Sequence, residues 1–195
     1  MSIDSVHPAD SNVSIALLHY PVYDKNRQVV ATAVTNLDLH DIARAARTYG
    51  LFRYYVVTPL REQQVLVSRI ARHWQEGWGA DYNPKRKAAL ELVTIADSLV
   101  ETVEKLENHY GKKVKVVATG AKGHAKSISY ADMKTLLQDC SQPYLLLFGT
   151  GWGLTDEIIS CADHVLMPIT GAGDYNHLSV RSAVAIILDR LMGQH

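Results

Sequence analysis

The chain has 195 residues, of which 47% are hydrophobic and 21% are charged, and this is the composition of an ordinary globular domain. It excludes disordered, collagen-like and coiled-coil proteins. Twenty basic side chains balance twenty acidic ones, which excludes a protein that binds nucleic acid through a basic field over its whole surface.

Membrane and secretory signals are missing from the sequence. Apolar runs stay well short of the roughly 18 residues that a membrane span needs, and residues 1–10 carry acids where a signal peptide has basic and then apolar residues. The two cysteines, Cys140 and Cys161, are too few for a disulfide framework. We therefore expect a protein of the reducing cytoplasm that makes no contact with a membrane.

Short β-branched or aromatic runs alternate with longer helical patterns, which is typical of an α/β domain with a mainly parallel sheet. Most of the runs are almost continuously apolar, as in strands that helices cover on both faces. We expect a six-stranded sheet and one domain over residues 1–195, with a helical insertion at about residues 60–112. The predicted strands are 14–20, 28–35, 52–57, 114–118, 144–148 and 163–167.

Helical patterns occupy most of the remaining chain. The first predicted helix covers residues 38–49, with Asp38 as its N-cap and Gly50 just beyond its end. Leucines seven residues apart predict one long helix over 84–109, and Pro84 suits its first turn. The other predicted helices are 61–76 and 175–192, and residues 74–83 are expected to form an exposed connection.

Three glycine-containing loops each follow a predicted strand, and they are the strongest chemical signal in the sequence. They are Thr119–Ala121, Gly149–Leu154 and Pro168–Asp174. Glycine lets a ligand approach bare backbone, and open parallel sheets bind ligands at the carboxyl ends of their strands. We expect the three loops to form one binding rim.

Two common nucleotide folds fit these loops poorly. In a Rossmann domain the glycine-rich turn follows the first strand, whereas here only 42 residues follow Gly153. The segment Gly120–Ser127 lacks the Gly-Lys pair of a phosphate-binding loop, because Ala125 stands before Lys126. An ordinary dinucleotide enzyme and an ATPase are therefore disfavoured.

The balanced charge hides an uneven distribution. Residues 61–127 carry 12 basic and 8 acidic side chains, whereas residues 128–195 carry 3 and 7. The sequence around Lys85, Arg86 and Lys87 also holds Trp74, Trp78 and Tyr82, and a basic region with aromatic residues can hold unpaired RNA. These aromatic residues could equally pack the insertion against the sheet.

Three ordered motifs resemble the SPOUT superfamily of knotted RNA methyltransferases, which includes the SpoU and TrmD groups. Asn36 with Arg44 and Gly50 resembles the first motif of the SpoU group. The loop Gly149–Leu154 is similar to the second, and Leu166–Ile187 is similar to the third. The whole chain also resembles a small bacterial family of predicted SPOUT RNA methyltransferases that has the helical insertion.

The resemblance implies a C-terminal trefoil knot, bound S-adenosylmethionine and a homodimer whose active site takes residues from both protomers. It implies an enzyme of class EC 2.1.1.- that methylates tRNA or rRNA at a ribose 2′-oxygen or a base nitrogen. Methyl transfer from a sulfonium needs no metal, and we expect none. The implied cofactor-binding residues are Thr119, Gly120, Phe148, Gly149, Gly151, Gly153, Ile169, Gly171 and Leu178.

The resemblance places Arg44 beside the target ribose and makes Asn36 a second catalytic candidate. A guanidinium stays protonated, so Arg44 would act electrostatically. His40, Asp174 and His177 are candidates for the missing base, and His177 is nearest the third motif. Gly151 stands where the SpoU group usually has Glu, which leaves open an alternative: a non-catalytic RNA-interaction module that binds S-adenosylmethionine or another nucleotide.

Overall fold

The computed structural model describes residues 11–76, 78–173 and 175–194. Two predictions concern residues outside this part of the chain: the lack of a signal peptide at residues 1–10, and Asp174 as a candidate base. A parallel sheet forms the centre, with strand order β5-β4-β1-β8-β6-β9-β7. The strands are β1 (Val13–Leu18), β4 (Tyr54–Val57), β5 (Val93–Ala96), β6 (Lys115–Ala118), β7 (Ser127–Ile128), β8 (Tyr144–Gly149) and β9 (His164–Leu166).

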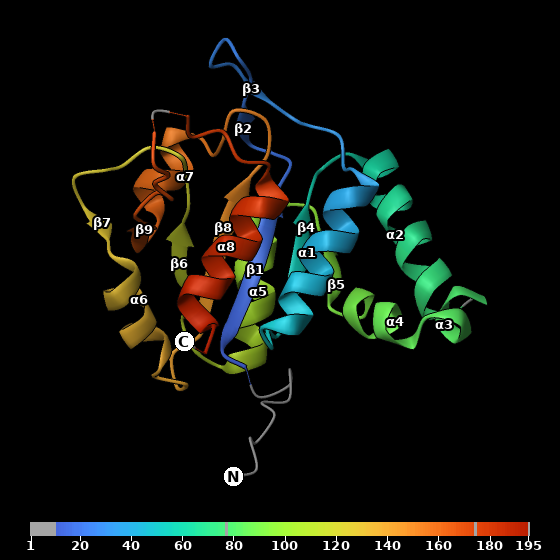
Figure 1. Cartoon of the computed structure of the whole chain (residues 1–195). Helices are drawn as coiled ribbons and strands as arrows, with labels where there is room; N and C mark the ends of the chain where they lie inside the picture. Colours follow the sequence, from blue (N-terminus) through green and yellow to red (C-terminus); the bar gives the residue numbers. More distant parts are fainter. Residues whose placement is uncertain (1–10, 77, 174, 195) are drawn as a thin grey trace.

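Helices cover both faces of this sheet, as the sequence predicted (Figure 1). Along β1, Ile15 and Leu17 face one core whereas Ala16 and Leu18 face the other, because successive side chains of a strand point to opposite faces. The first core packs against α1 (Asn36–Thr48), α2 (Arg61–Gln75), α4 (Pro84–Leu90), α6 (Tyr130–Leu137) and α8 (Val180–Met192). The second packs against α5 (Leu99–Tyr110) and α7 (Asp156–Cys161).

The predicted strand 28–35 is wrong as a member of the main sheet. Only Val29–Val30 is extended as β3, and it pairs antiparallel with β2 (Val22–Tyr23) in a separate hairpin. The next residues pair with no strand and run along the edge of a cavity that Thr32 and Ala33 help to line. In the described part of the chain the sheet therefore has seven strands instead of the six predicted, because the predicted strand 28–35 is not part of it whereas β5 and β7 are.

The single long helix predicted over residues 84–109 is also wrong. The β-branched run Val93–Ala96 pairs with β4 as the strand β5, between α4 and α5. Ser98 then starts α5 as an N-cap, since its hydroxyl accepts a hydrogen bond from the Glu101 backbone amide. The described residues of the segment 60–112 thus form four helices and one strand of the central sheet, and residues 78–82 form the short helix α3 (Trp78–Tyr82).

Helix α1 begins slightly before its predicted start. Its N-cap is Thr35, whose hydroxyl accepts a hydrogen bond from the Asp38 amide and donates one to the Asp38 carboxylate. Asp38 is therefore the acidic partner inside the first turn, three residues after the cap. Gly50 follows the helix with a φ of 68°, as predicted for the residue that ends it.

No helix in the described part of the chain is both long and apolar enough to cross a bilayer.

Candidate active site

A cavity of about 700 Å³ lies at the carboxyl ends of β6 and β8 and beside the segment that follows β9. The three glycine-containing loops approach one another here because parallel strands end at the same edge of the sheet. Asn176, two residues beyond the third loop, donates a hydrogen bond to the Ala121 carbonyl of the first loop at 3.1 Å. The cavity lining therefore joins segments that are more than fifty residues apart in sequence.

The second glycine loop is held tightly on its outer side. Thr150 donates hydrogen bonds to the Leu18 carbonyl from its amide and its hydroxyl. Gly151 and Gly153 have φ values of 58° and 98°, in the region that favours glycine. A Cβ atom on Gly151 would lie 2.8 Å from the Tyr23 carbonyl oxygen, so the loop depends on bare backbone at this position.

The β2–β3 hairpin forms a wall of the cavity that the sequence did not predict. Tyr23 exchanges backbone hydrogen bonds with Trp152 and Gly153. Arg27 lies over the Tyr23 ring at 4.2 Å and forms an ion pair with Asp156 at 2.5 Å. The hairpin is thereby fastened both to the glycine loop and to the start of α7.

An ion-pair group joins α1 to α8 at the edge of the cavity. Arg181 lies 3.3 Å from the Asp38 carboxylate and 3.5 Å from that of Asp41. Asp38 is buried and Arg181 is about one-third exposed, and both line the cavity. This pairing could not be predicted from local sequence patterns, because Asp38 and Arg181 are 143 positions apart.

His19 lies fully buried behind the cavity wall, at the end of β1. Its Nδ1 atom is 3.1 Å from the Thr32 hydroxyl, and Thr32 is hydrogen-bonded to Thr150 of the glycine loop. Burial lowers the pKa of His19 to about 4, against a smaller opposing effect of the Asp38 carboxylate. The imidazole is therefore neutral at physiological pH, and it supports the loop by hydrogen bonding.

We expect His19 to make the protein less stable at acid pH. In the unfolded chain histidine titrates near 6.5, so between pH 6.5 and 4 the unfolded state binds more protons than the folded state. The free energy of unfolding should fall by about 3 kcal/mol across this window because of His19. Urea unfolding of the wild type and of His19→Gln at pH 7, 5.5 and 4.5 measures the effect.

The stability of two histidine variants should respond differently to acid. His19→Gln should lose less stability on acidification than the wild type, whereas His124→Gln, at an exposed position, should follow the wild type. Identical acid dependence in the wild type and in His19→Gln would show that His19 does not titrate as described.

Nine of the residues predicted from the resemblance line this cavity, and three do not. Gly171 is outside the lining, and so are Asn36 and Arg44, which are exposed on α1. The exposed His177 is at the rim, whereas His40 packs against Trp74, away from the cavity. The nine lining residues are Thr119, Gly120, Phe148, Gly149, Gly151, Gly153, Ile169, His177 and Leu178. Their roles remain predictions.

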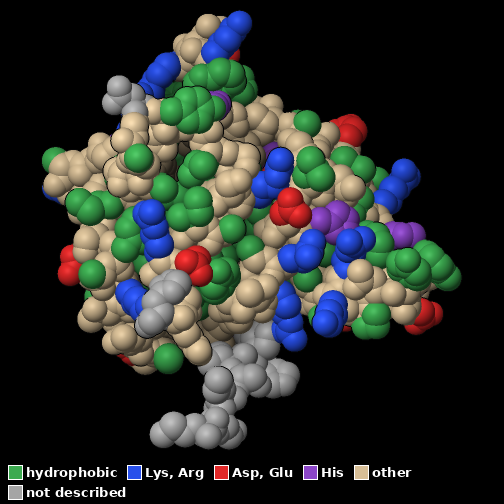
Figure 2. Space-filling view, in the orientation of Figure 1, with side chains coloured by type: hydrophobic (Ala, Val, Ile, Leu, Met, Phe, Trp, Pro, Cys, Tyr) green, Lys and Arg blue, Asp and Glu red, His purple; other side chains and the backbone are tan. Residues whose placement is uncertain are grey.

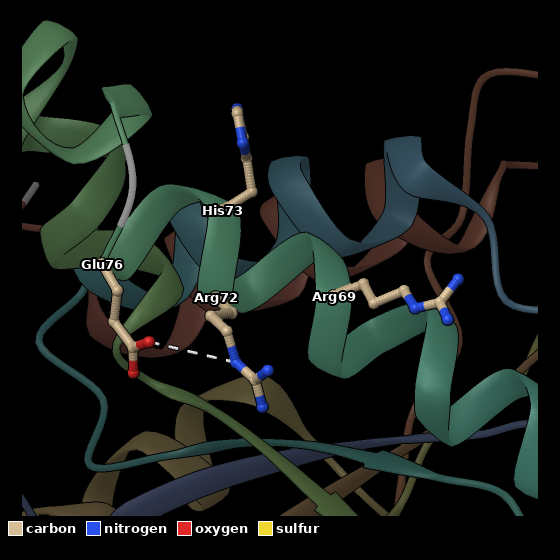
Figure 3. Close-up of a pocket in the computed structure, with 4 residues that line it drawn as sticks. All are labelled: Arg69, Arg72, His73 and Glu76. Carbon is tan, nitrogen blue, oxygen red and sulfur yellow. Dashed lines mark ion pairs between the residues drawn. The ribbon is translucent and has the colours of Figure 1, made fainter.

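A second depression of about 370 Å³ lies on the exposed side of α2. Figure 3 shows its four side chains, and Arg69 and Arg72 point to a different side of the helix from His73. The one ion pair drawn there, Arg72 with Glu76, is long at 3.9 Å and exposed at both ends. None of the described side chains that line this depression is buried, so the cavity at the glycine loops is the candidate active site.

None of the groupings of histidine, cysteine, aspartate and glutamate among the described residues has three members placed to hold a metal ion.

Comparison with known proteins identifies relatives over almost the whole chain. The family described as SAM-dependent RNA methyltransferase matches residues 12–193. A protein named only as uncharacterized, from Aquifex aeolicus (strain VF5), is 41% identical over 95% of this chain and 91% of its own length. A tRNA (guanine-N(1)-)-methyltransferase from Oleidesulfovibrio alaskensis is 42% identical over 93% of this chain, which spans only 42% of that longer protein.

Solved structures share the fold at low sequence identity. The TrmH/SpoU tRNA modifying enzyme of A. aeolicus superposes with a TM-score of 0.56 at 18% identity, over 96% of this chain and 76% of that one. The SpoU methyltransferase AviRb of Streptomyces viridochromogenes, in complex with AdoMet, has a TM-score of 0.54 at 18% identity, over 94% and 57% of the two chains.

Proposed function

This chain belongs to the SAM-dependent RNA methyltransferase family, and from this membership we propose that it methylates tRNA. Membership in the family makes S-adenosylmethionine its cofactor and RNA its substrate. The choice of tRNA rests on the relatives named as tRNA methyltransferases, of which this chain spans less than half. The guanine-N1 activity in their names describes those longer proteins, so the acceptor atom is left for experiment to identify.

The candidate active site fits S-adenosylmethionine in size and chemistry. Its volume of about 700 Å³ lies within the usual range for small-molecule sites. A Cβ atom on Gly153 would meet nothing within 4 Å, and one on Gly120 only the Lys122 amide at 4.0 Å, so both glycines face open space. Backbone groups at these two glycines and at Phe148, Ile169 and Leu178 would hold the adenosine part of S-adenosylmethionine.

When bound, S-adenosylmethionine supplies a methyl group on a positively charged sulfur, ready for in-line displacement. The residues of this chain align the acceptor with that group, and such alignment can lower the activation barrier by about 7 to 11 kcal/mol. His177, exposed at the rim, is the proposed base that removes the acceptor proton. Asn36 and Arg44 cannot serve the cavity of their own protomer as it stands, because neither lines it.

We further propose a homodimer in which Arg44 acts at the partner's active site. Arg44 is exposed on the outer side of α1, and Leu37 on the same helix is 58% exposed. An isologous dimer that covers α1 would bring each Arg44 to the opposite protomer. There the guanidinium would stabilise negative charge that develops on the acceptor. The proposal includes the single domain and the C-terminal trefoil knot expected from the sequence.

The convergence on one cavity of the loops that follow β6, β8 and β9 is the observation that supports the cofactor site in this proposal. Isothermal titration with S-adenosylmethionine and S-adenosylhomocysteine tests it, with ATP and NAD as controls. We expect selective binding of the two sulfur compounds. Incubation with unmodified tRNA and radiolabelled cofactor, followed by nuclease digestion and mass spectrometry, then identifies the methylated atom. Binding of ATP or NAD instead would refute the cofactor site, and methylation of rRNA but not tRNA would refute the substrate.

A further inference from the structure

Two large aromatic side chains are exposed at the end of the molecule formed by α3. Trp78 and Tyr82 are 72% and 70% exposed, and their rings stack with centroids 4.7 Å apart and 20° between the planes. The opposite side of α3 is close-packed, because a Cβ atom on Gly79 would lie 2.9 Å from the Trp74 ring. The packing of α3 against α2 therefore holds the aromatic pair outward.

Helix α4 places three cations directly beside this pair in the sequence. Lys85 and Arg86 lie in its first turn, after the N-cap Asn83, and Lys87 lies in its last turn. Cations are unfavourable at the N-terminus of a helix, since the helix dipole is positive there. Arg86 lies 4.4 Å from the Trp74 ring centroid, and within the described chain none of the three forms an ion pair. The exposed acids Asp81 and Glu91 flank them without pairing.

Arg86 of α4 lies close enough to α1 to act on His40 of that helix. His40 has a lowered pKa, first because it is half-buried and next because Arg86 disfavours its charged form, while Arg44 acts in the same direction. Asp41 opposes this effect. In Figure 2, blue and purple side chains gather over the part of the face formed by α1, α2 and α4.

We propose that this surface, formed by Trp78, Tyr82, Lys85, Arg86 and Lys87, binds unpaired nucleotides of the RNA substrate. The basic side chains match the charge of the phosphates, and an exposed aromatic face stacks on a base. Unpaired RNA is favoured over a duplex because bases in a duplex are already stacked on one another. Helix α4 packs against α1, which carries Arg44, so in the proposed dimer the surface would guide the RNA toward the partner's cavity. This last step rests on the proposed function.

Fluorescence anisotropy with two labelled RNAs tests the aromatic part of this surface. One probe is a hairpin with an unpaired loop, and the other is a fully paired duplex of similar length. Trp78→Ala combined with Tyr82→Ala should weaken binding of the hairpin by about 5- to 150-fold for each stacked base that is lost. Duplex binding should change much less. Because both side chains are exposed, circular dichroism should show an unaltered fold.

Salt dependence tests the basic part. Lys85→Gln with Lys87→Gln should reduce the slope of log affinity against log salt by about 1.4, which corresponds to two lost phosphate contacts on single-stranded RNA. The matched control is Lys112→Gln with Lys113→Gln, two exposed lysines that precede β6. This control should leave the slope unchanged.

The anisotropy measurement needs no cofactor, so it separates this inference from the proposed function. Equal hairpin affinity in the wild type and in both double variants would overturn the RNA surface, even if S-adenosylmethionine binds normally. A wild type that binds neither RNA would also overturn the RNA surface, and a protein partner would then be the alternative occupant of this surface. Loss of hairpin binding in the variants would support it, even if the cofactor titration failed.

Discussion

Replacing Gly149 by alanine should weaken S-adenosylmethionine binding strongly, and turnover should fall by about 100-fold. A Cβ atom at this position would lie 2.7 Å from the Leu154 amide nitrogen and 2.9 Å from the Gly153 carbonyl carbon. Both are backbone atoms of the loop that lines the cavity, so the loop itself must move. A displacement of about 1 Å at a catalytic site can cost about 100-fold in rate.

Gly111→Ala is the matched control for this change. Gly111 ends α5 with a φ of 63°, and a Cβ atom there would meet nothing within 4 Å. We expect a loss of about 1 kcal/mol in the free energy of unfolding, from backbone strain alone, and unchanged cofactor affinity. The two variants therefore separate strain at a glycine from displacement of the cavity wall.

A second variant keeps the test informative if Gly149→Ala folds poorly. Gly120→Leu introduces a side chain where the structure has open space beside the cavity, so the protein itself should tolerate it. We expect it to block the cofactor while thermal unfolding stays close to that of the wild type. Normal S-adenosylmethionine affinity in both Gly149→Ala and Gly120→Leu would place the cofactor elsewhere.

Arg44→Ala should lower turnover by about 100- to 1,000-fold and leave cofactor affinity unchanged. The rate effect is the usual size for loss of one group that stabilises developing charge. The affinity should not change because Arg44 does not line the cavity of its own protomer. Arg47→Ala is the matched control, since Arg47 is also exposed on α1 and lies one turn further along. It should retain near wild-type turnover.

Mixing two inactive variants tests whether Arg44 acts on the partner. In a heterodimer of Arg44→Ala and Gly149→Ala, the intact cavity of the first protomer would receive the intact Arg44 of the second. Random exchange of protomers should then restore about one quarter of wild-type activity. An equimolar mixture, unfolded and refolded together, measures this. No recovery, although analytical ultracentrifugation shows dimers, would place Arg44 at its own protomer's site or outside catalysis.

The fold could be predicted where local patterns were unambiguous. The apolar runs of β1, β4, β6, β8 and β9 and the amphipathic patterns of α1 and α2 are found close to their predicted positions. Helix α8 ends as predicted but begins at Val180 instead of residue 175, after the N-cap Ser179. The prediction failed over residues 84–109, where the leucine spacing suited a helix. A β-branched run followed by the cap residue Ser98 was the available signal for β5, and pairing with β4 outweighed the helical spacing.

The sequence by itself determined the α/β class, the parallel sheet and the common location of the three glycine loops. The reason is that parallel strands end at one edge, so loops that follow neighbouring strands meet there. Only the tertiary structure decided the remaining walls of the site. Asp38 meets Arg181, and the hairpin around Tyr23 covers the glycine loop, through contacts between residues more than a hundred positions apart. Local periodicity cannot predict such contacts, because they depend on how whole helices and strands pack against one another.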